Sequence, residues 1–181
     1  WGKLALEYKG QKALFSGSIP LQYDGQKLEV TARGDWKPDF SGTLETRVKG
    51  VLDGEKVALE LKGPWNALEL SGTWPRYNTQ LSGRLALPEL TYRATVRAKV
   101  ESYPVRLDAR GNGDEYTLEG QIQGDEGGTV RLSGRDLSTW NAVAENFKTR
   151  GVNLNGKLEN GPNGLNGALE GRVSDIPFNL N

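Results

Sequence analysis

Apolar and polar residues alternate with a period of two along almost the whole chain. Between 3 and 9, for example, Leu4, Leu6 and Tyr8 share one side, and Glu7 lies on the other. Successive side chains of a strand point to opposite faces, whereas a helix repeats its apolar positions every three or four residues. The pattern therefore predicts β-strands with one apolar face and one charged face.

The same alternation recurs in about a dozen short segments. They lie at 3–9, 27–33, 43–49, 56–62, 68–70, 81–87, 92–101, 105–107, 116–122, 130–132, 152–158 and 165–173. Turn sequences such as Asp24-Gly25, Asp53-Gly54 and Gly111-Asn112-Gly113 separate them, and these residue types supply the positive φ of tight hairpins. We expect consecutive strands to pair as an antiparallel meander.

One segment, 136–150, breaks the alternation. Leu137, Trp140, Ala144 and Phe147 follow one another at three- and four-residue spacing, and Gly151 comes next as a stop signal. This spacing predicts an amphipathic helix over 136–150. The chain then forms one segment, 1–181, with strands at 1–135 and 151–181 on either side of the helix.

Glycine recurs at apolar positions within the strands. The pattern aliphatic-x-Gly-x-aliphatic occurs at 81–85, 118–122, 154–158 and 165–169, and Leu70-Ser71-Gly72-Thr73-Trp74 resembles it. A glycine inside a strand marks a bend, a bulge or a close approach of another group. Two interpretations follow: the glycines let a curved sheet fit, or they keep a lumen open for a guest.

A sheet with one apolar face must hide that face, and three architectures do so. The sheet curls into a trough or barrel with an apolar interior, packs as a sandwich, or forms an outer-membrane barrel. Most of the runs are about seven to nine residues long, short of the ~9 to 11 of membrane-spanning strands, and the Trp and Tyr residues do not form two girdles. We therefore expect an all-β meander curled into a trough or barrel.

Composition removes most enzymatic chemistry. The 181 residues include no His and no Cys, so Ser/His/Asp and Cys/His sites and ordinary zinc sites are excluded. We expect no enzyme activity, no metal and no cofactor. Because 23 basic residues balance 23 acidic ones, no nucleic-acid partner is expected either. A chain that opens at Trp1 in mid-pattern and contains no Met is expected to be part of a longer one.

The apolar face is mostly aliphatic, which suits alkyl chains, since these need no hydrogen bonds. We expect it to line a groove for lipid or for a client strand. The predicted lining residues are Leu28, Val30, Leu44, Val48, Val57, Leu59, Leu61, Leu68, Leu70, Leu81, Leu85, Tyr92, Val96, Leu107, Leu118, Ile122, Val130, Leu132, Leu154, Leu158, Leu165 and Leu169.

The segment 59–74, Leu-Glu-Leu-Lys-Gly-Pro-Trp-Asn-Ala-Leu-Glu-Leu-Ser-Gly-Thr-Trp, repeats the phrase Leu-x-Leu-x-Gly. In this style, which covers most of the chain, the sequence resembles the C-terminal region of TamB-type proteins, relatives of the AsmA-like family. The resemblance implies an elongated hydrophobic β groove in the periplasm, with the parent chain anchored in the inner membrane. It also implies phospholipid transport or outer-membrane protein assembly with an outer-membrane barrel partner.

Two other functions fit the same pattern. A closed lipocalin-like barrel would bind one small apolar ligand. A purely structural β repeat would fill the apolar face with its own side chains.

Overall fold

The computed structural model describes residues 2–23, 25–124, 127–135, 138–149, 151–173 and 176–180. Its strands are antiparallel, and their order in the sheet follows the chain from β1 to β15. The predicted all-β meander is confirmed. The order is linear, so the sheet is open, and the closed-barrel alternative is wrong. The chain divides into two compact units, residues 1–94 and 95–181.

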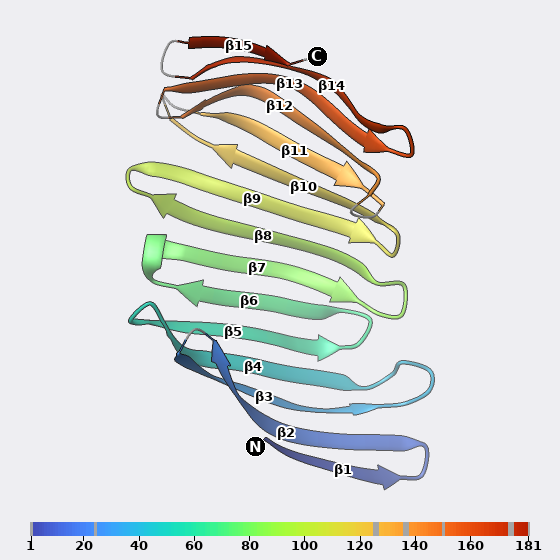
Figure 1. Ribbon diagram of the computed structural model, residues 1–181. Coiled ribbons are helices and arrows are strands. Elements are labelled where there is room, and N and C mark those ends of the chain that lie inside the picture. Colours follow the sequence, from blue (N-terminus) through green and yellow to red (C-terminus); the bar gives the residue numbers. More distant parts are fainter. Residues whose placement is uncertain are drawn as a thin grey trace. The chain divides into compact units, whose positions relative to one another are not determined.

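Unit 1 is built from consecutive hairpins (Figure 1). It contains β1 (Lys3–Lys9), β2 (Lys12–Tyr23), β3 (Gln26–Trp36), β4 (Thr43–Leu52), β5 (Glu55–Pro64), β6 (Leu68–Trp74), the 3₁₀ turn η1 (Arg76–Asn78), β7 (Thr79–Ala86) and the first residues of β8 (Thr91–Val100). Each strand from β1 to β6 pairs antiparallel with the next.

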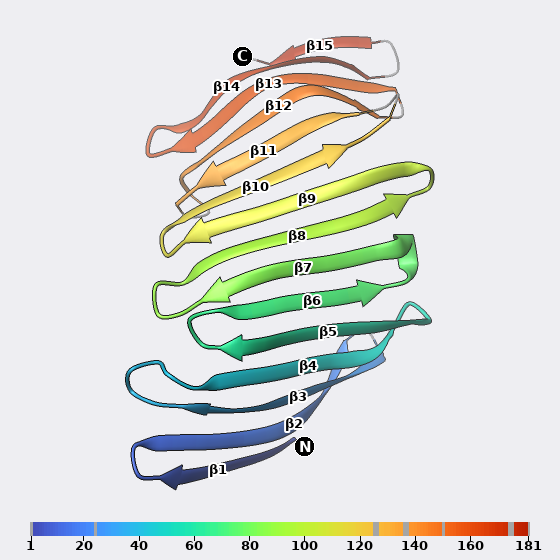
Figure 2. The same cartoon turned by 180° about the vertical axis from the view of Figure 1, so that it is seen from behind.

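Unit 2 repeats this arrangement, as the reverse view shows (Figure 2). After the remainder of β8 it contains β9 (Tyr103–Asn112), β10 (Glu115–Ile122), β11 (Gly128–Gly134), β12 (Trp140–Thr149), β13 (Val152–Gly161), β14 (Gly164–Val173) and β15 (Ile176–Leu180). Its strands from β9 onward also pair with their neighbours in sequence.

In the described part of the chain, fifteen strands replace the dozen expected, because β2, β12 and β15 were not predicted. In β2 the alternation is interrupted by Gly17, which takes an apolar position, and by Pro20. Proline is tolerated where a strand lacks a neighbour on one side. Among the described residues, pairing with β1 ends at Ser18, so Pro20 lies outside the paired stretch. The strand therefore accommodates both residues.

The predicted helix at 136–150 is wrong, since residues 140–149 form β12. Trp140, Ala142 and Ala144 are spaced by two residues, as in a regular strand, and each is paired with a residue of β13. A β-bulge then inserts one extra residue before Phe147. Asn146 takes a positive φ of 49° at this bulge, and its N–H donates to Asn155 Oδ1 at 2.6 Å.

A two-residue period followed by one inserted residue gives spacings of four and three, which imitate a helix. Asp136, Leu137 and Arg150 of this prediction lie outside the described residues. No helix in the described part of the chain is long and apolar enough to cross a bilayer.

The glycines at apolar positions are contact points rather than openings. A Cβ at Gly72 would overlap Leu59 Cδ2 from the paired strand β5, and one at Gly120 would lie 3.1 Å from Leu107 Cδ2. The leucine of one strand thus fills the notch left by the glycine of the next. At Gly83 the backbone itself is close, since a Cβ would lie 2.6 Å from the carbonyl oxygen of Arg93.

Gly83→Ala is therefore expected to lower the free energy of unfolding by about 1–3 kcal/mol, because the added methyl group displaces strand backbone. Gly161→Ala is the matched control, since a Cβ there meets nothing within 4 Å. It should change stability by less than ~0.5 kcal/mol. Urea denaturation followed by circular dichroism measures both, and equal effects would contradict the close approach at Gly83.

Candidate functional site: the apolar sheet face

Strand register places the predicted lining residues of unit 1 on one face of its sheet. Val30 lies opposite Val48, which lies opposite Leu59, and Leu61 lies opposite Leu70. The other members follow from the same registers and from strand alternation: Leu28, Leu44, Val57, Leu68, Leu81 and Leu85. Tyr92 shares this face two residues before Ala94, which packs beside Gly83.

The predicted residues of unit 2 also share one face. Leu118 is paired with Leu132. Gly120, which lies between Leu118 and Ile122 in β10, is paired with Leu107 on one side and with Val130 on the other. Leu154, Leu158, Leu165 and Leu169 belong to this face through the registers of β13 and β14. The hydroxyl of Thr95 donates a hydrogen bond to Asp108 on the charged face. Val96 is the next residue of the strand, so it lies on the opposite, apolar face.

The face extends over residues that the sequence did not assign to the site. In unit 1, Phe15 and Ile19 of β2 continue it, since they pair with Gly34 and Val30. In unit 2, Ala142 and Ala144 of β12 continue it. The signal for β2 was present, because the two-residue period runs through Gly17 once glycine is counted as an apolar position.

Much of the face is accessible. Leu59 is 39% exposed in unit 1, and Leu107 and Leu118 are 50% and 44% exposed in unit 2. When many exposed leucines lie together on one face, that face is normally a surface that binds an apolar partner or ligand. Within each unit the described strands contact chiefly their neighbours in sequence, so no second layer of described elements covers the face.

One end of the unit 1 face is closed by an aromatic contact. Trp65, in the loop after β5, crosses β4: its indole N–H donates to the carbonyl of Asp35 on β3 at 2.7 Å. Its ring lies 6.2 Å from the ring of Phe15 on β2. Leu68, which begins β6 just after this loop, is 1% exposed. A small core of Trp65, Phe15 and Leu68 therefore lies at this end of the face.

The opposite face carries a network of charges across three strands. Arg33 forms a hydrogen bond with Glu45. The guanidinium group of Arg47 lies 2.7 Å from the carboxylate of Glu45 and 2.9 Å from that of Glu60, so it links the two. Lys62 completes the network at 2.9 Å from Glu60. Opposite charges on neighbouring strands stabilise the pairing modestly when exposed to water. This charged face is therefore suited to contact with water.

The network shifts the pKa of its members. Hydrogen bonds donated by Lys62 and then by Arg47 lower the pKa of Glu60. The same carboxylate raises the pKa of Lys62, and with Glu45 it raises that of Arg47. In unit 2, Arg106 and then Thr95 lower the pKa of Asp108, which lies directly opposite Glu119. Arg106 and Arg131 thus hold two carboxylates side by side.

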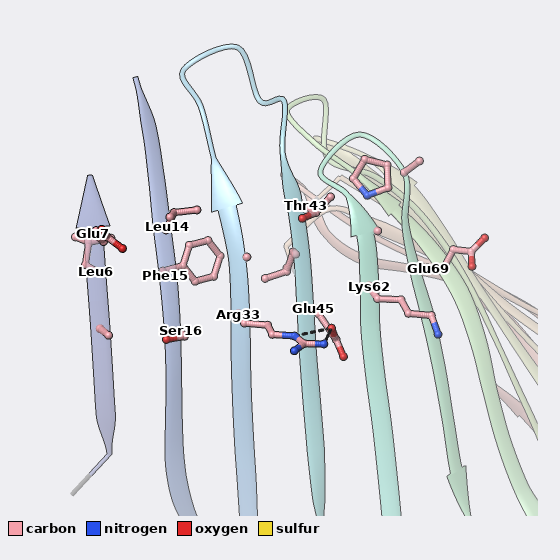
Figure 3. A pocket seen from close by; sticks show the side chains of 16 residues that line it. Leu6, Glu7, Leu14, Phe15, Ser16, Arg33, Thr43, Glu45, Lys62 and Glu69 are labelled. Carbon is pink, nitrogen blue, oxygen red and sulfur yellow. Dashed lines mark hydrogen bonds and ion pairs between the residues drawn. The ribbon is translucent and has the colours of Figure 1, made fainter. Parts of the chain in front are cut away.

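A hollow of about 960 Å³ lies at the strand ends of β1 to β6 (Figure 3). Leu6, Phe15 and Leu44 line it from the apolar alternation, and Arg33 and Glu45, joined by a hydrogen bond, line it from the charged one. Of the predicted lining residues only Leu44 contributes to this hollow. Its mixed wall suits an alkyl chain less well than the leucine-rich face does.

Comparisons of the chain with protein families, with curated proteins and with solved structures gave no match. The resemblance to TamB-type proteins therefore stays a prediction.

Trp65→Phe should lower the free energy of unfolding by about 1 kcal/mol, because the ring contact remains while the carbonyl of Asp35 loses its donor. Trp65→Ala removes the ring as well and should cost about 3 kcal/mol. Trp36→Phe serves as control, since Trp36 is 38% exposed, and should stay within ~0.5 kcal/mol. Urea titrations compare the three; a neutral Trp65→Ala would show that the contact closes nothing.

The lowered pKa of Glu60 predicts acid sensitivity. Its contribution to folding is complete above the ordinary glutamate pKa of about 4.3 and is lost as the pH falls through the lower folded-state pKa. Glu60→Gln should therefore lose less stability than the unmodified chain between neutral and acid pH. Lys62→Met, which removes the main donor, should reduce the acid sensitivity too. Urea midpoints across this pH range measure it, and parallel curves would refute the assignment.

Proposed function

We propose that this chain is a non-catalytic segment of a hydrophobic β groove that holds phospholipid acyl chains. The observation that carries the proposal is the accessible aliphatic face, which the strand registers assemble from the predicted residues in each unit. Alkyl chains make no hydrogen bonds, and covering apolar surface contributes about 25 cal/mol per Å². The opposite face, with its network of charges, stays in water.

The distribution of exposure supports a site along the middle of the strands. Trp65 and Leu68 are packed into the small core at one end of the unit 1 face, so their own surfaces are largely covered there. Leu59 is 39% exposed, Leu107 50% and Leu118 44%, so an apolar guest would cover accessible leucine surface at these positions. Because neighbouring leucines fill the glycine notches, the guest lies on a continuous surface rather than inside discrete pockets.

The resemblance to TamB-type proteins supports the wider setting of the proposal. In that setting the groove lies in the periplasm of a cell envelope, the parent chain is anchored in the inner membrane, and an outer-membrane barrel is its partner. Phospholipid transport and outer-membrane protein assembly are the two processes that the resemblance brings. The aliphatic lining favours the first, since a client strand would seek backbone hydrogen bonds at a sheet edge instead.

A structural β repeat is the second candidate function. The observation in its favour is the set of leucine-filled glycine notches, since side chains of the sheet occupy space that a guest could take. The lipocalin-like alternative has lost its basis, because the strand order is open.

Leu59→Asp is expected to weaken phospholipid binding at least ~5-fold, because an alkyl chain laid on this position would bury a carboxylate. Ala58→Asp is the matched control: it is the preceding residue of β5, exposed, and on the charged face. It should change binding less than ~2-fold. Fluorescence anisotropy of a dye-labelled phosphatidylcholine titrated with each variant measures the affinity, and circular dichroism verifies folding.

Native mass spectrometry of the purified chain adds an independent measurement. Phospholipid that co-purifies with the unmodified chain and with Ala58→Asp, but not with folded Leu59→Asp, supports the groove. A chain that binds no phospholipid in either measurement, or binds it equally well in both variants, overturns the proposal in favour of the structural repeat.

A further inference from the structure

The apolar face of unit 1 carries polar groups at the end opposite Trp65. Glu55 begins β5, whereas Trp65 follows the last residue of that strand. Glu55 lies two residues before Val57 and therefore shares the apolar face with it. Trp74 ends β6, which pairs antiparallel with β5, so Trp74 lies at the same end as Glu55. One end of the face is thus closed by aromatic rings, and the other carries a carboxylate and an indole N–H.

Two buried polar atoms at this end have no hydrogen-bond partner. Among the described residues, none bonds to Glu55 Oε2 or to the indole nitrogen of Trp74. The first atom is an acceptor and the second is a donor. Most buried polar groups in proteins are hydrogen-bonded, so an unpaired group calls for a partner from outside the chain, either water or a ligand.

A cation lies beside these two groups, in the turn η1. Figure 1 shows η1 at the same end of the strands as the β4–β5 turn. The guanidinium carbon of Arg76 lies 5.9 Å from the ring centre of Trp74 and 5.2 Å from that of Tyr77. Asp53 in the β4–β5 turn forms an ion pair with Arg76, whose side chain is 41% exposed. A guanidinium has five N–H donors, more than this one carboxylate uses, so donors remain for an anion.

The backbone of η1 is strained where it holds this cation. Tyr77 has a φ of 60° and Asn78 one of 49°, in the left-handed region that a bulky residue rarely adopts. The N–H of Asn78 donates to the carbonyl of Pro75 at 2.8 Å, and the hydroxyl of Thr79 donates to that of Arg76 at 2.9 Å. Strain of this kind is concentrated at ligand clamps and active sites. A plain connection from β6 to β7 would not require it.

We propose that this end of the face binds the headgroup of a phospholipid with a primary ammonium group, as in phosphatidylethanolamine. Arg76 donates to the phosphate oxygens, a geometry for which arginine is well suited. The ammonium group donates to Glu55, whose terminal torsion is soft enough to turn either oxygen toward it. The acyl chains then lie along the strands toward Trp65. The inference rests on the proposed function, since it assumes that the apolar face holds acyl chains.

Other common headgroups satisfy only part of this set. The quaternary ammonium group of phosphatidylcholine has no N–H to donate to Glu55. Phosphatidylglycerol has no cation, and its net negative charge would lie beside the carboxylates of Glu55 and Asp53. A neutral headgroup with one phosphate and one N–H-bearing cation matches one guanidinium and one unpaired carboxylate.

Competition between phospholipids tests the headgroup. Dye-labelled phosphatidylcholine is bound to the 181-residue chain and displaced by unlabelled dioleoyl lipids with ethanolamine, choline or glycerol headgroups, and fluorescence anisotropy follows the displacement. Phosphatidylethanolamine should compete at least ~5-fold better than the other two, because it alone adds a charge-assisted hydrogen bond to Glu55. Glycerophosphoethanolamine, which has the same headgroup without acyl chains, should not displace the label at the same concentrations, because the chains supply most of the binding.

Glu55→Gln should remove the preference, because a neutral amide does not attract the ammonium group. Phosphatidylethanolamine should then compete within ~2-fold of phosphatidylcholine, whose own affinity stays unchanged. Arg76→Gln should weaken all three lipids at least ~5-fold, since each carries a phosphate. Glu29→Gln is the control for the loss of a carboxylate, because Glu29 is exposed on the charged face of β3. It should keep the preference, and circular dichroism verifies that each variant folds.

The outcomes separate this inference from the proposed function. Equal competition by the three lipids, a preference that survives Glu55→Gln, or undiminished binding by Arg76→Gln overturns the headgroup site alone and leaves water as the partner of Glu55. Displacement by glycerophosphoethanolamine assigns the site to a water-soluble phosphate ester and overturns it too. A chain that binds none of the three lipids overturns the headgroup site and the acyl-chain groove together.

Discussion

The antiparallel backbone ladder between consecutive strands is the interaction on which this structure depends. Within each unit the described strands contact chiefly their neighbours in sequence, so hydrogen bonds and cross-strand pairs carry the stability that a second layer supplies in most β proteins. Register is then decisive, because a slip of one residue would exchange the two faces. The hairpin turns and the opposite charges on neighbouring strands hold that register.

Glycine and leucine complete the ladder on the apolar side. Leu59 packs where Gly72 has no side chain, and Leu107 does the same at Gly120. Such pairs allow strands to approach closely and give the face some packing of its own. They also explain how a face can be half-covered without a second sheet, and why its remaining exposed area is available for an apolar guest.

The proposed lipid binding uses the apolar face of the sheet. On that face the side chains determine what is bound, because the backbone groups of the described strands are already paired with neighbouring strands.

The two-residue period by itself determined the all-β class, the meander and the faces to which Leu59, Leu118 and the other lining residues belong. It could do so because side-chain direction in a strand follows from sequence parity alone. The period failed where the backbone departs from a regular strand. At Asn146 one extra residue shifts the two-residue alternation, so the apolar spacing of β12 resembles that of a helix. In β2, Gly17 and Pro20 interrupt the alternation, so the strand was not predicted.

Only the tertiary structure decided whether the sheet is open, which glycine notches are filled and where the face is closed. These features depend on contacts between residues distant in sequence, such as Trp65 with Phe15 and with the carbonyl of Asp35. A local pattern carries the direction of each side chain but not the identity of what it meets across the sheet.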